Sequence, residues 1–242
     1  MTKSKIAELD VESPKQLARI AGILYLLVGI FGGFSEGYVD PKMYIPGNAR
    51  TTAANIAAHT ELVRLSVIAH LLDGTFFVIL AMVLYVLLKH VNKNVARSML
   101  ILVSLAAGII CLNAVFQFEA LRVETGAVNL ATPLGRDGSN SIALLLLDIQ
   151  HYGTLVAQVF FGLWLVPLGY LTYKSNWFPK TLAVVLVLGG ICYLIDLLAA
   201  FLIPDFSQKA STIITIPSAV AEIWMVGYLL IIGIRTNAKK RS

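Results

Sequence analysis

The stretch Ser98–Leu121, SMLILVSLAAGIICLNAVFQFEAL, decides the fold of this chain. Its only charged residue, Glu119, stands close to its end. A helix needs about 20 mostly apolar residues to cross the roughly 30 Å hydrocarbon core of a bilayer. The stretch is therefore predicted to be a transmembrane helix, and the bilayer is the solvent of at least this part of the chain.

Five further stretches have the same character. The six predicted spans are residues 17–34, 62–88, 98–121, 142–173, 181–203 and 213–234. Turn-forming residues lie between them, at Asp40-Pro41, Ile45-Pro46-Gly47 and Thr132-Pro133-Leu134-Gly135. We therefore predict an all-α fold, a polytopic membrane bundle of six helices that forms one integral membrane domain over residues 1–242.

The composition of the whole chain agrees with a membrane protein. Of its 242 residues, 57% are hydrophobic and 14% are charged, whereas an average soluble domain is about 45–50% apolar and about 25% charged. A soluble enzyme, a disordered tail and a nucleic-acid-binding protein are all disfavoured. Both cysteines, Cys111 and Cys192, lie inside apolar stretches, so no disulfide framework is predicted.

The basic residues predict the orientation of the bundle. With both termini in the cytoplasm, thirteen of the nineteen lysines and arginines fall on the inner side and six on the outer side. This bias follows the positive-inside rule. We therefore predict a multi-pass protein of the plasma membrane with both termini cytoplasmic. The net charge of +5 is explained by topology and requires no nucleic-acid partner.

Polar residues within the spans gather in the outer half of the predicted bundle. Counted from the outer end of each span at 1.5 Å per residue, they lie about 9–17 Å deep, while the inner halves carry almost none. Such residues usually face a bundle interior or a water-filled cavity. We predict one outward-facing, ligand-binding cavity formed by His70, Asp73, Asn113, Asp148, His151, Asp196 and Glu222.

Helical spacing divides these residues by role. His70 and Asp73 are three residues apart, as are Asp148 and His151, so each pair shares one helix face. These four are predicted to contact the ligand, with Asp196 and Glu222 either as counter-charges or as groups that support the four from behind. Four carboxylates without a lysine or arginine at their level cannot all stay ionised. Protonation, pairing with a histidine, a bound cation, or approach of Arg64 or Arg122 from the rim all remain open.

Three functions fit this pattern. Binding of a cation or small polar ligand uses the one-sided layer most directly, and a non-enzymatic role is favoured because no catalytic motif is present. A membrane-embedded metal-dependent hydrolase would hold zinc at His70, Asp73, Asp148 and His151. A proton- or cation-coupled transporter would use the same groups as a relay. The structural alternative is that residues such as Asn113, Gln117 and Gln158 only hydrogen-bond the helices together.

Three segments carry a family resemblance: LARIAGILY at residues 17–25, YKSNWFPKTL at residues 173–182 and PSAVAEIW at residues 217–224. In these segments the chain resembles the bacterial and archaeal membrane proteins called domain of unknown function 4386 (DUF4386). The resemblance implies a multi-helix membrane protein and no established activity. It therefore assigns no catalytic residues and no cofactor.

Overall fold

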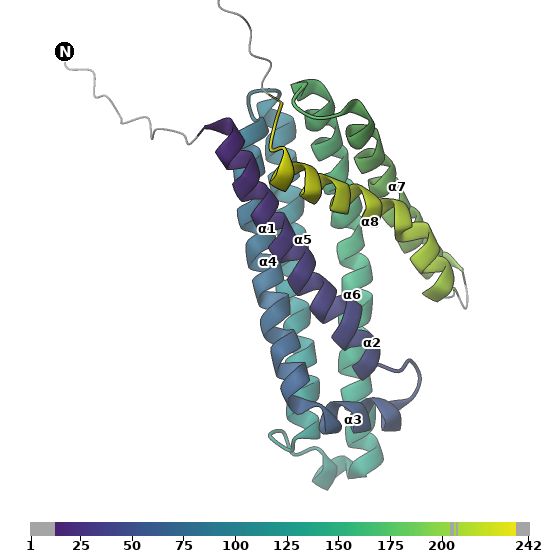
Figure 1. Ribbon diagram of the computed structural model, residues 1–242. Coiled ribbons are helices and arrows are strands. Elements are labelled where there is room, and N and C mark those ends of the chain that lie inside the picture. The colour runs from purple at the N-terminus through teal and green to yellow at the C-terminus, as the bar shows by residue number, and fades with distance from the viewer. Residues whose placement is uncertain (1–12, 204–205, 207, 236–242) are drawn as a thin grey trace, which may run out of the picture.

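A computed structural model describes residues 13–203, 206 and 208–235 (Figure 1). Within these residues the chain is helical and has no β-strand, and six helical segments are long and apolar enough to cross a membrane. The predicted polytopic helical fold is confirmed. The elements are α1 (Pro14–Phe34), the π-helical turn η1 (Ser35–Val39), α2 (Asp40–Met43), α3 (Ala49–Ala58), α4 (Thr60–Leu88), α5 (Lys93–Glu124), α6 (Ala131–Ser175), α7 (Lys180–Leu202) and α8 (Gln208–Ile231).

The first span is longer than predicted and runs from Pro14 through α1, η1 and α2 to Met43. The turn predicted at Asp40-Pro41 is wrong, because the chain is still helical there. Pro41 lies in the first turn of α2, where a missing backbone N–H is tolerated. The π-helical turn before it is of a kind often found at functional sites. Glu36 and Asp40 are consequently carried on a helix and not on a connector.

The connectors contain helix that their turn residues did not predict. The turn at Ile45-Pro46-Gly47 is confirmed, with Gly47 at a φ of 70°. Helix α3 follows it and lies across one end of the bundle (Figure 1), with Asn48 accepting a hydrogen bond of 3.0 Å from the backbone N–H of Thr51. The turn predicted at residues 132–135 is instead the start of α6, which is interrupted at Gly135 by a φ of 72°.

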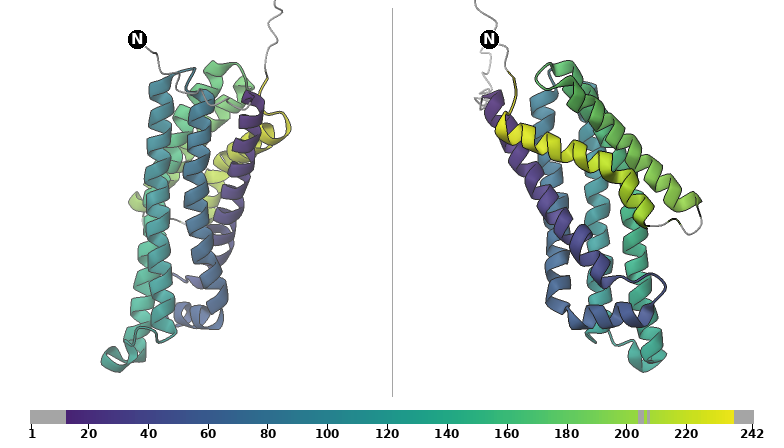
Figure 2. Two further views of the ribbon diagram at one scale, coloured as in Figure 1. Left: turned by 90° about the vertical axis from the view of Figure 1, so that its left-hand side faces the viewer. Right: turned by 45° about the vertical axis from the view of Figure 1, so that its right-hand side comes forward.

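The long helices pack in the ring order α1, α4, α5, α6, α7, α8 and back to α1. The start of α1 and the end of α8 lie together, because Gly233 is packed beside Lys15. We call this the terminal end of the bundle, and the end that carries α3 the distal end. Helix α8 crosses the bundle obliquely, as Figure 1 and the right-hand view of Figure 2 show. That the terminal end is cytoplasmic remains a prediction from the basic residues.

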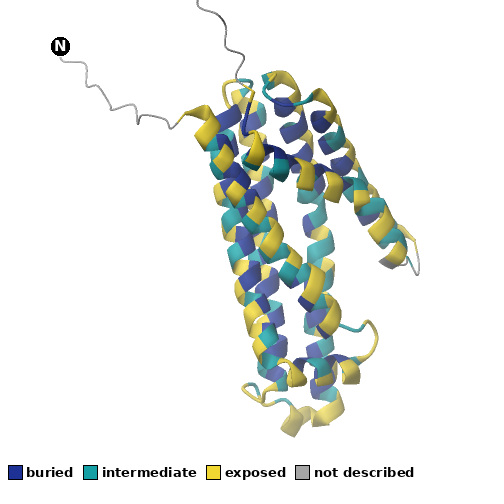
Figure 3. Cartoon of the chain, viewed as in Figure 1, coloured by how far each residue is buried: buried dark blue, intermediate teal, exposed yellow. Residues whose placement is uncertain are grey.

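Apolar side chains fill the terminal half and also cover the outside of the bundle. A buried cluster that includes Leu84, Met99, Trp164 and Leu182 joins helices α4 to α7. Outward-facing positions on every long helix are exposed and apolar, and they alternate with buried positions around each helix (Figure 3). Large apolar surfaces of this kind are not stable in water, so the lipid bilayer is the environment that suits this exterior.

Candidate functional site

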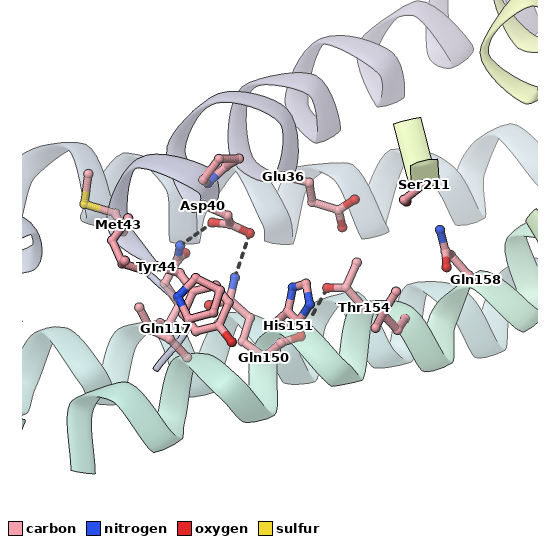
Figure 4. A pocket seen from close by; sticks show the side chains of 15 residues that line it. Glu36, Asp40, Met43, Tyr44, Gln117, Gln150, His151, Thr154, Gln158 and Ser211 are labelled. Carbon is pink, nitrogen blue, oxygen red and sulfur yellow. Dashed lines mark hydrogen bonds between the residues drawn. The ribbon is translucent and has the colours of Figure 1, made fainter. Parts of the chain in front are cut away.

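A cavity of about 530 Å³ lies between the η1–α2 segment and α6 (Figure 4). Its polar lining includes Glu36, Asp40, Tyr44, Gln150, His151 and Gln158, and its apolar lining includes Met43, Leu147 and Leu155. Ser211 of α8 borders it from the opposite side. Among the described residues, no lysine or arginine lines this space. The cavity is therefore acidic and has the size of a small-molecule site.

Asp40 is held in a fixed position by amides from two other helices. Gln117 of α5 donates a hydrogen bond of 2.7 Å to Oδ1, and Gln150 of α6 donates one of 2.8 Å to Oδ2. The Nε2 atom of His70 on α4 lies 3.4 Å from the same Oδ2 atom. Hydrogen bonds to a charged group are among the stronger ones in proteins. Asp40 thus connects α2 with three neighbouring helices at the base of the cavity.

Glu36 differs from Asp40, although it lies only four residues earlier. Its carboxylate points into the cavity (Figure 4). No side chain in the described part of the chain donates a hydrogen bond to it. A carboxylate within a membrane span needs a compensating partner. Glu36 is therefore the acidic group of the cavity that remains available to a ligand.

Tyr44 closes one end of the cavity through two contacts with α6. Its hydroxyl donates a hydrogen bond of 2.5 Å to Oδ1 of Asp148, and its ring lies 5.2 Å from that of His151, measured between centroids. Burial, together with the hydrogen bond to Asp148, raises the pKa of the Tyr44 phenol. Tyr44 therefore stays protonated and keeps donating to Asp148 in neutral and mildly alkaline solution.

A second polar cluster surrounds Glu222 near the crossing of α1 and α8. Tyr25 and Tyr193 each donate a hydrogen bond to its carboxylate, over 3.1 Å and 3.3 Å. Close by along α7, Asp196 is fully buried and accepts a hydrogen bond of 3.0 Å from Gln158. Two hydroxyl donors therefore engage the Glu222 carboxylate, whereas Asp196 accepts one amide hydrogen bond on Oδ2 and its Oδ1 atom has no partner among the described residues.

Asp73 and Asn113 occupy the interface between helices, away from the cavity lining. Asp73 is buried beside Gly32 of α1, and its Oδ1 atom has no hydrogen-bond partner among the described residues. Asn113 donates a hydrogen bond of 3.2 Å to Thr154 of α6 and packs against Gly153. The contacts of Asn113 match the structural role that interhelical polar residues often have.

The two rim arginines do not approach the buried carboxylates. Arg64 lies 3.9 Å from Glu61, and Arg122 donates a hydrogen bond of 2.7 Å to Glu119, in each case one turn away on the same helix. The proposed approach of these arginines from the rim is therefore wrong. A glutamate three residues away is reached at little cost in side-chain entropy, which makes the local pair the more favourable choice.

The predicted metal ligands do not converge. His70 lies beside Asp40, whereas Asp148 and His151 lie around Tyr44. Within residues 13–203, 206 and 208–235, no three histidine, cysteine, aspartate or glutamate side chains are grouped so that they could hold a metal ion. The zinc site stays a prediction that receives no support from this geometry.

Of the seven residues predicted from the sequence to form a cavity, His151 lines this one, whereas Glu36, Asp40, Tyr44 and Gln150, which also line it, were missed. Glu36 and Asp40 were assigned to a connector because Pro41 was interpreted as a turn residue. Their spacing of four residues, directly after an apolar span, was the signal that could have placed both on one continuing helix.

The comparison with protein families agrees with this architecture. The model of the family described as "Domain of unknown function (DUF4386)" matches residues 20–233, which is most of the chain and includes all six spans in whole or in large part. No protein of curated function matches the chain. No solved structure matches it either. The chain belongs to the DUF4386 family of membrane proteins.

Proposed function

We propose that this membrane protein binds a small organic cation, with the Glu36 carboxylate as its counter-charge. The observation that carries the proposal is a carboxylate that receives no hydrogen bond from the described side chains, in an acidic cavity of about 530 Å³ with no lysine or arginine among its described lining residues. Small-molecule sites usually have volumes of about 300–1,000 Å³. The ammonium group of the ligand would supply a positive counter-charge for the Glu36 carboxylate.

The neighbours of Glu36 support an organic cation over a bare metal ion. Asp40 already accepts hydrogen bonds on both oxygens, and Asp148 is engaged by Tyr44. Two lining oxygens, the amide oxygens of Gln117 and Gln158, have no hydrogen-bond partner among the described residues, but they are uncharged, and a calcium ion takes about 6–8 oxygen ligands. The rings of Tyr44 and His151, together with Leu155, provide apolar and aromatic surface for the body of an organic molecule.

The buried apolar cluster of the terminal half favours a binding function rather than a transport function, because transport would need a continuous path through the membrane. It includes Leu84, Met99, Trp164 and Leu182, and it fills the bundle on the terminal side of the cavity. If the terminal end is cytoplasmic, the cavity lies in the outer half of the bilayer. The ligand then comes from outside the cell or from the outer leaflet.

The test uses benzylammonium as the cation and benzyl alcohol as its uncharged counterpart, with protein purified in a maltoside detergent. Binding raises the unfolding temperature with ligand concentration. We expect benzylammonium to stabilise the wild-type protein and benzyl alcohol to have a much smaller effect. Glu36→Gln keeps the shape of the side chain and is expected to weaken benzylammonium binding about 10-fold or more, as loss of a charged hydrogen bond does.

Glu61→Gln is the matched control, because Glu61 is exposed and its ion-pair partner in the described part of the chain is Arg64 on its own helix. This variant is expected to bind benzylammonium like the wild type. Equal binding by the wild type and Glu36→Gln, or equal stabilisation by the amine and the alcohol, would overturn the proposal.

A further inference from the structure

The cavity lies next to a lateral gap between α1 and α8, and the gap begins where these helices part. At Tyr25, α1 contacts both neighbours: the ring packs edge-on against Trp164 of α6, with centroids 5.6 Å apart, and the hydroxyl bonds to Glu222 of α8. Nearer the terminal end, Gly22 of α1 packs directly against Leu229 of α8, and toward the distal end the two helices diverge in Figure 1 and in the right-hand view of Figure 2. Tyr25 therefore marks the boundary of their packing.

Gly29 lies one turn beyond Tyr25 on the same face of α1, and it is exposed. A Cβ atom added at Gly29 would have no atom within 4 Å. Glu36 follows seven residues later, again on this face. Within one turn, the face of α1 thus passes from close packing to open space, and it reaches the cavity about two turns further on.

Helix α8 leaves this region because it packs on α7. Ser218, one turn before Glu222, is buried and donates a hydrogen bond of 2.7 Å to the backbone oxygen of Gly189. Ser211, about two turns further toward the start of α8, borders the cavity. The two edges of the gap are therefore α1 near Gly29 and the first half of α8.

The gap lies at the depth of the hydrocarbon core. Tyr25 is eleven residues along the span that starts at Pro14, which corresponds to a rise of about 17 Å. The hydrocarbon core is about 30 Å thick, so the gap opens near the bilayer centre and continues into the distal leaflet. Ile30 on α1 and Ile216 and Val220 on α8 are exposed apolar residues, as expected for helices that face the hydrocarbon.

We propose that the ligand is an amphiphile whose ammonium head pairs with Glu36 and whose alkyl chain lies in the gap between α1 and α8. This inference rests on the proposed function and adds the ligand class and its lateral entry from the membrane. The cavity itself has an apolar part of its lining, including Leu147 and Leu155, and it reaches Ser211 of α8. The alkyl chain of the ligand, lying in the gap between α1 and α8, then stays in apolar surroundings, and only the ammonium head enters the acidic cavity.

The experiment compares ethylammonium, octylammonium and octanol as probes for purified protein in maltoside micelles. Each methylene that leaves water contributes a factor of about four in affinity, so we expect octylammonium to bind the wild type at least about 10-fold more tightly than ethylammonium. Octanol is expected to bind weakly, because it has no charge for Glu36. Glu36→Gln is expected to weaken both ammonium probes.

Gly29→Trp fills the gap without displacing any neighbour of the glycine Cβ position. It is expected to remove most of the preference for octylammonium while leaving ethylammonium binding unchanged. Gly108→Trp on α5 is the matched control, because Gly108 is also exposed and also has open space around it. This control is expected to keep the full preference.

The outcomes separate the two proposals. Equal affinity of the wild type for the two ammonium probes, or an unchanged preference in Gly29→Trp, would overturn lateral binding and leave the small-cation function intact. Failure of both ammonium probes to bind, or binding of octylammonium that is indifferent to Glu36→Gln, would overturn both proposals. Circular dichroism and gel filtration confirm that each variant is folded before binding is compared.

Discussion

Gly153→Ala tests the packing that holds α6 against α5 beside the cavity. A Cβ atom at Gly153 would stand 2.3 Å from Oδ1 of Asn113 and 3.0 Å from its Cγ and Nδ2 atoms. Relative to an ordinary contact of 3.4 Å, the amide would have to move by roughly 1 Å. Asn113 is only 3% exposed, so it has little room to do so without losing its hydrogen bond to Thr154.

The expected cost follows from three terms. Overpacking of a filled interior costs about 1–3 kcal/mol, and the lost hydrogen bond costs about 1 kcal/mol. The higher helix propensity of alanine offsets about 1 kcal/mol of this loss in the free energy of unfolding. Gly153→Ala is therefore expected to lower the free energy of unfolding by about 1–3 kcal/mol.

The assay is denaturation of the purified protein in mixed micelles, with Gly108→Ala as the control. Gly108 has open space around it, so alanine there is expected to stabilise the protein by about 1 kcal/mol. In an Asn113→Ala background, Gly153→Ala is expected to become stabilising, because the obstructing amide is gone. If Gly153→Ala stabilised the wild-type protein as much as Gly108→Ala does, the close packing of α5 on α6 would be refuted.

Three further predictions concern other parts of the bundle. Tyr193→Phe removes one of the donors to Glu222 and is expected to lower the free energy of unfolding by about 1–3 kcal/mol; an unchanged value would contradict the hydrogen bond. With the native cysteines replaced, Gly126→Cys is expected to react with an impermeant thiol reagent on intact cells and Asn92→Cys is not; the reverse pattern would invert the predicted orientation. Because the pKa of Tyr44 is raised, its stabilising hydrogen bond is fully present below the ordinary tyrosine pKa of about 10 and is lost as the pH rises through the raised value. Difference spectra against Tyr44→Phe should show no ionised phenol at pH 10, and its appearance there would contradict this environment.

Hydropathy predicted the helical membrane fold because the bilayer imposes one requirement on every span. Each needs an apolar stretch long enough to cross the hydrocarbon and must satisfy its backbone groups internally. The stretch 98–121 meets this requirement by composition alone, and α5 includes all of it. Such a local criterion does not depend on how the helices are arranged.

The cavity could not be predicted in the same way, because it depends on relations between helices. The path of α8 follows from contacts such as that of Ser218 with Gly189, and no periodicity in either helix encodes their pairing. The continuation of the first span through Pro41 depends on a π-helical turn that turn propensities do not predict. The hydrogen bond from Tyr25 to Glu222 could not be predicted either, because the two residues are far apart in the chain.

The most direct test of the central claim is a distance measured by solid-state NMR in lipid bilayers. Protein carrying ¹³C-labelled glutamate side chains is mixed with ¹⁵N-benzylammonium, and carbon–nitrogen dipolar dephasing locates the bound cation. A charged hydrogen bond of about 2.8 Å places the nitrogen about 3–4 Å from the carboxyl carbon. The account predicts one strongly dephased glutamate carboxyl that is absent from Glu36→Gln. No dephasing in the wild type, or the same dephased signal in Glu36→Gln, would contradict it.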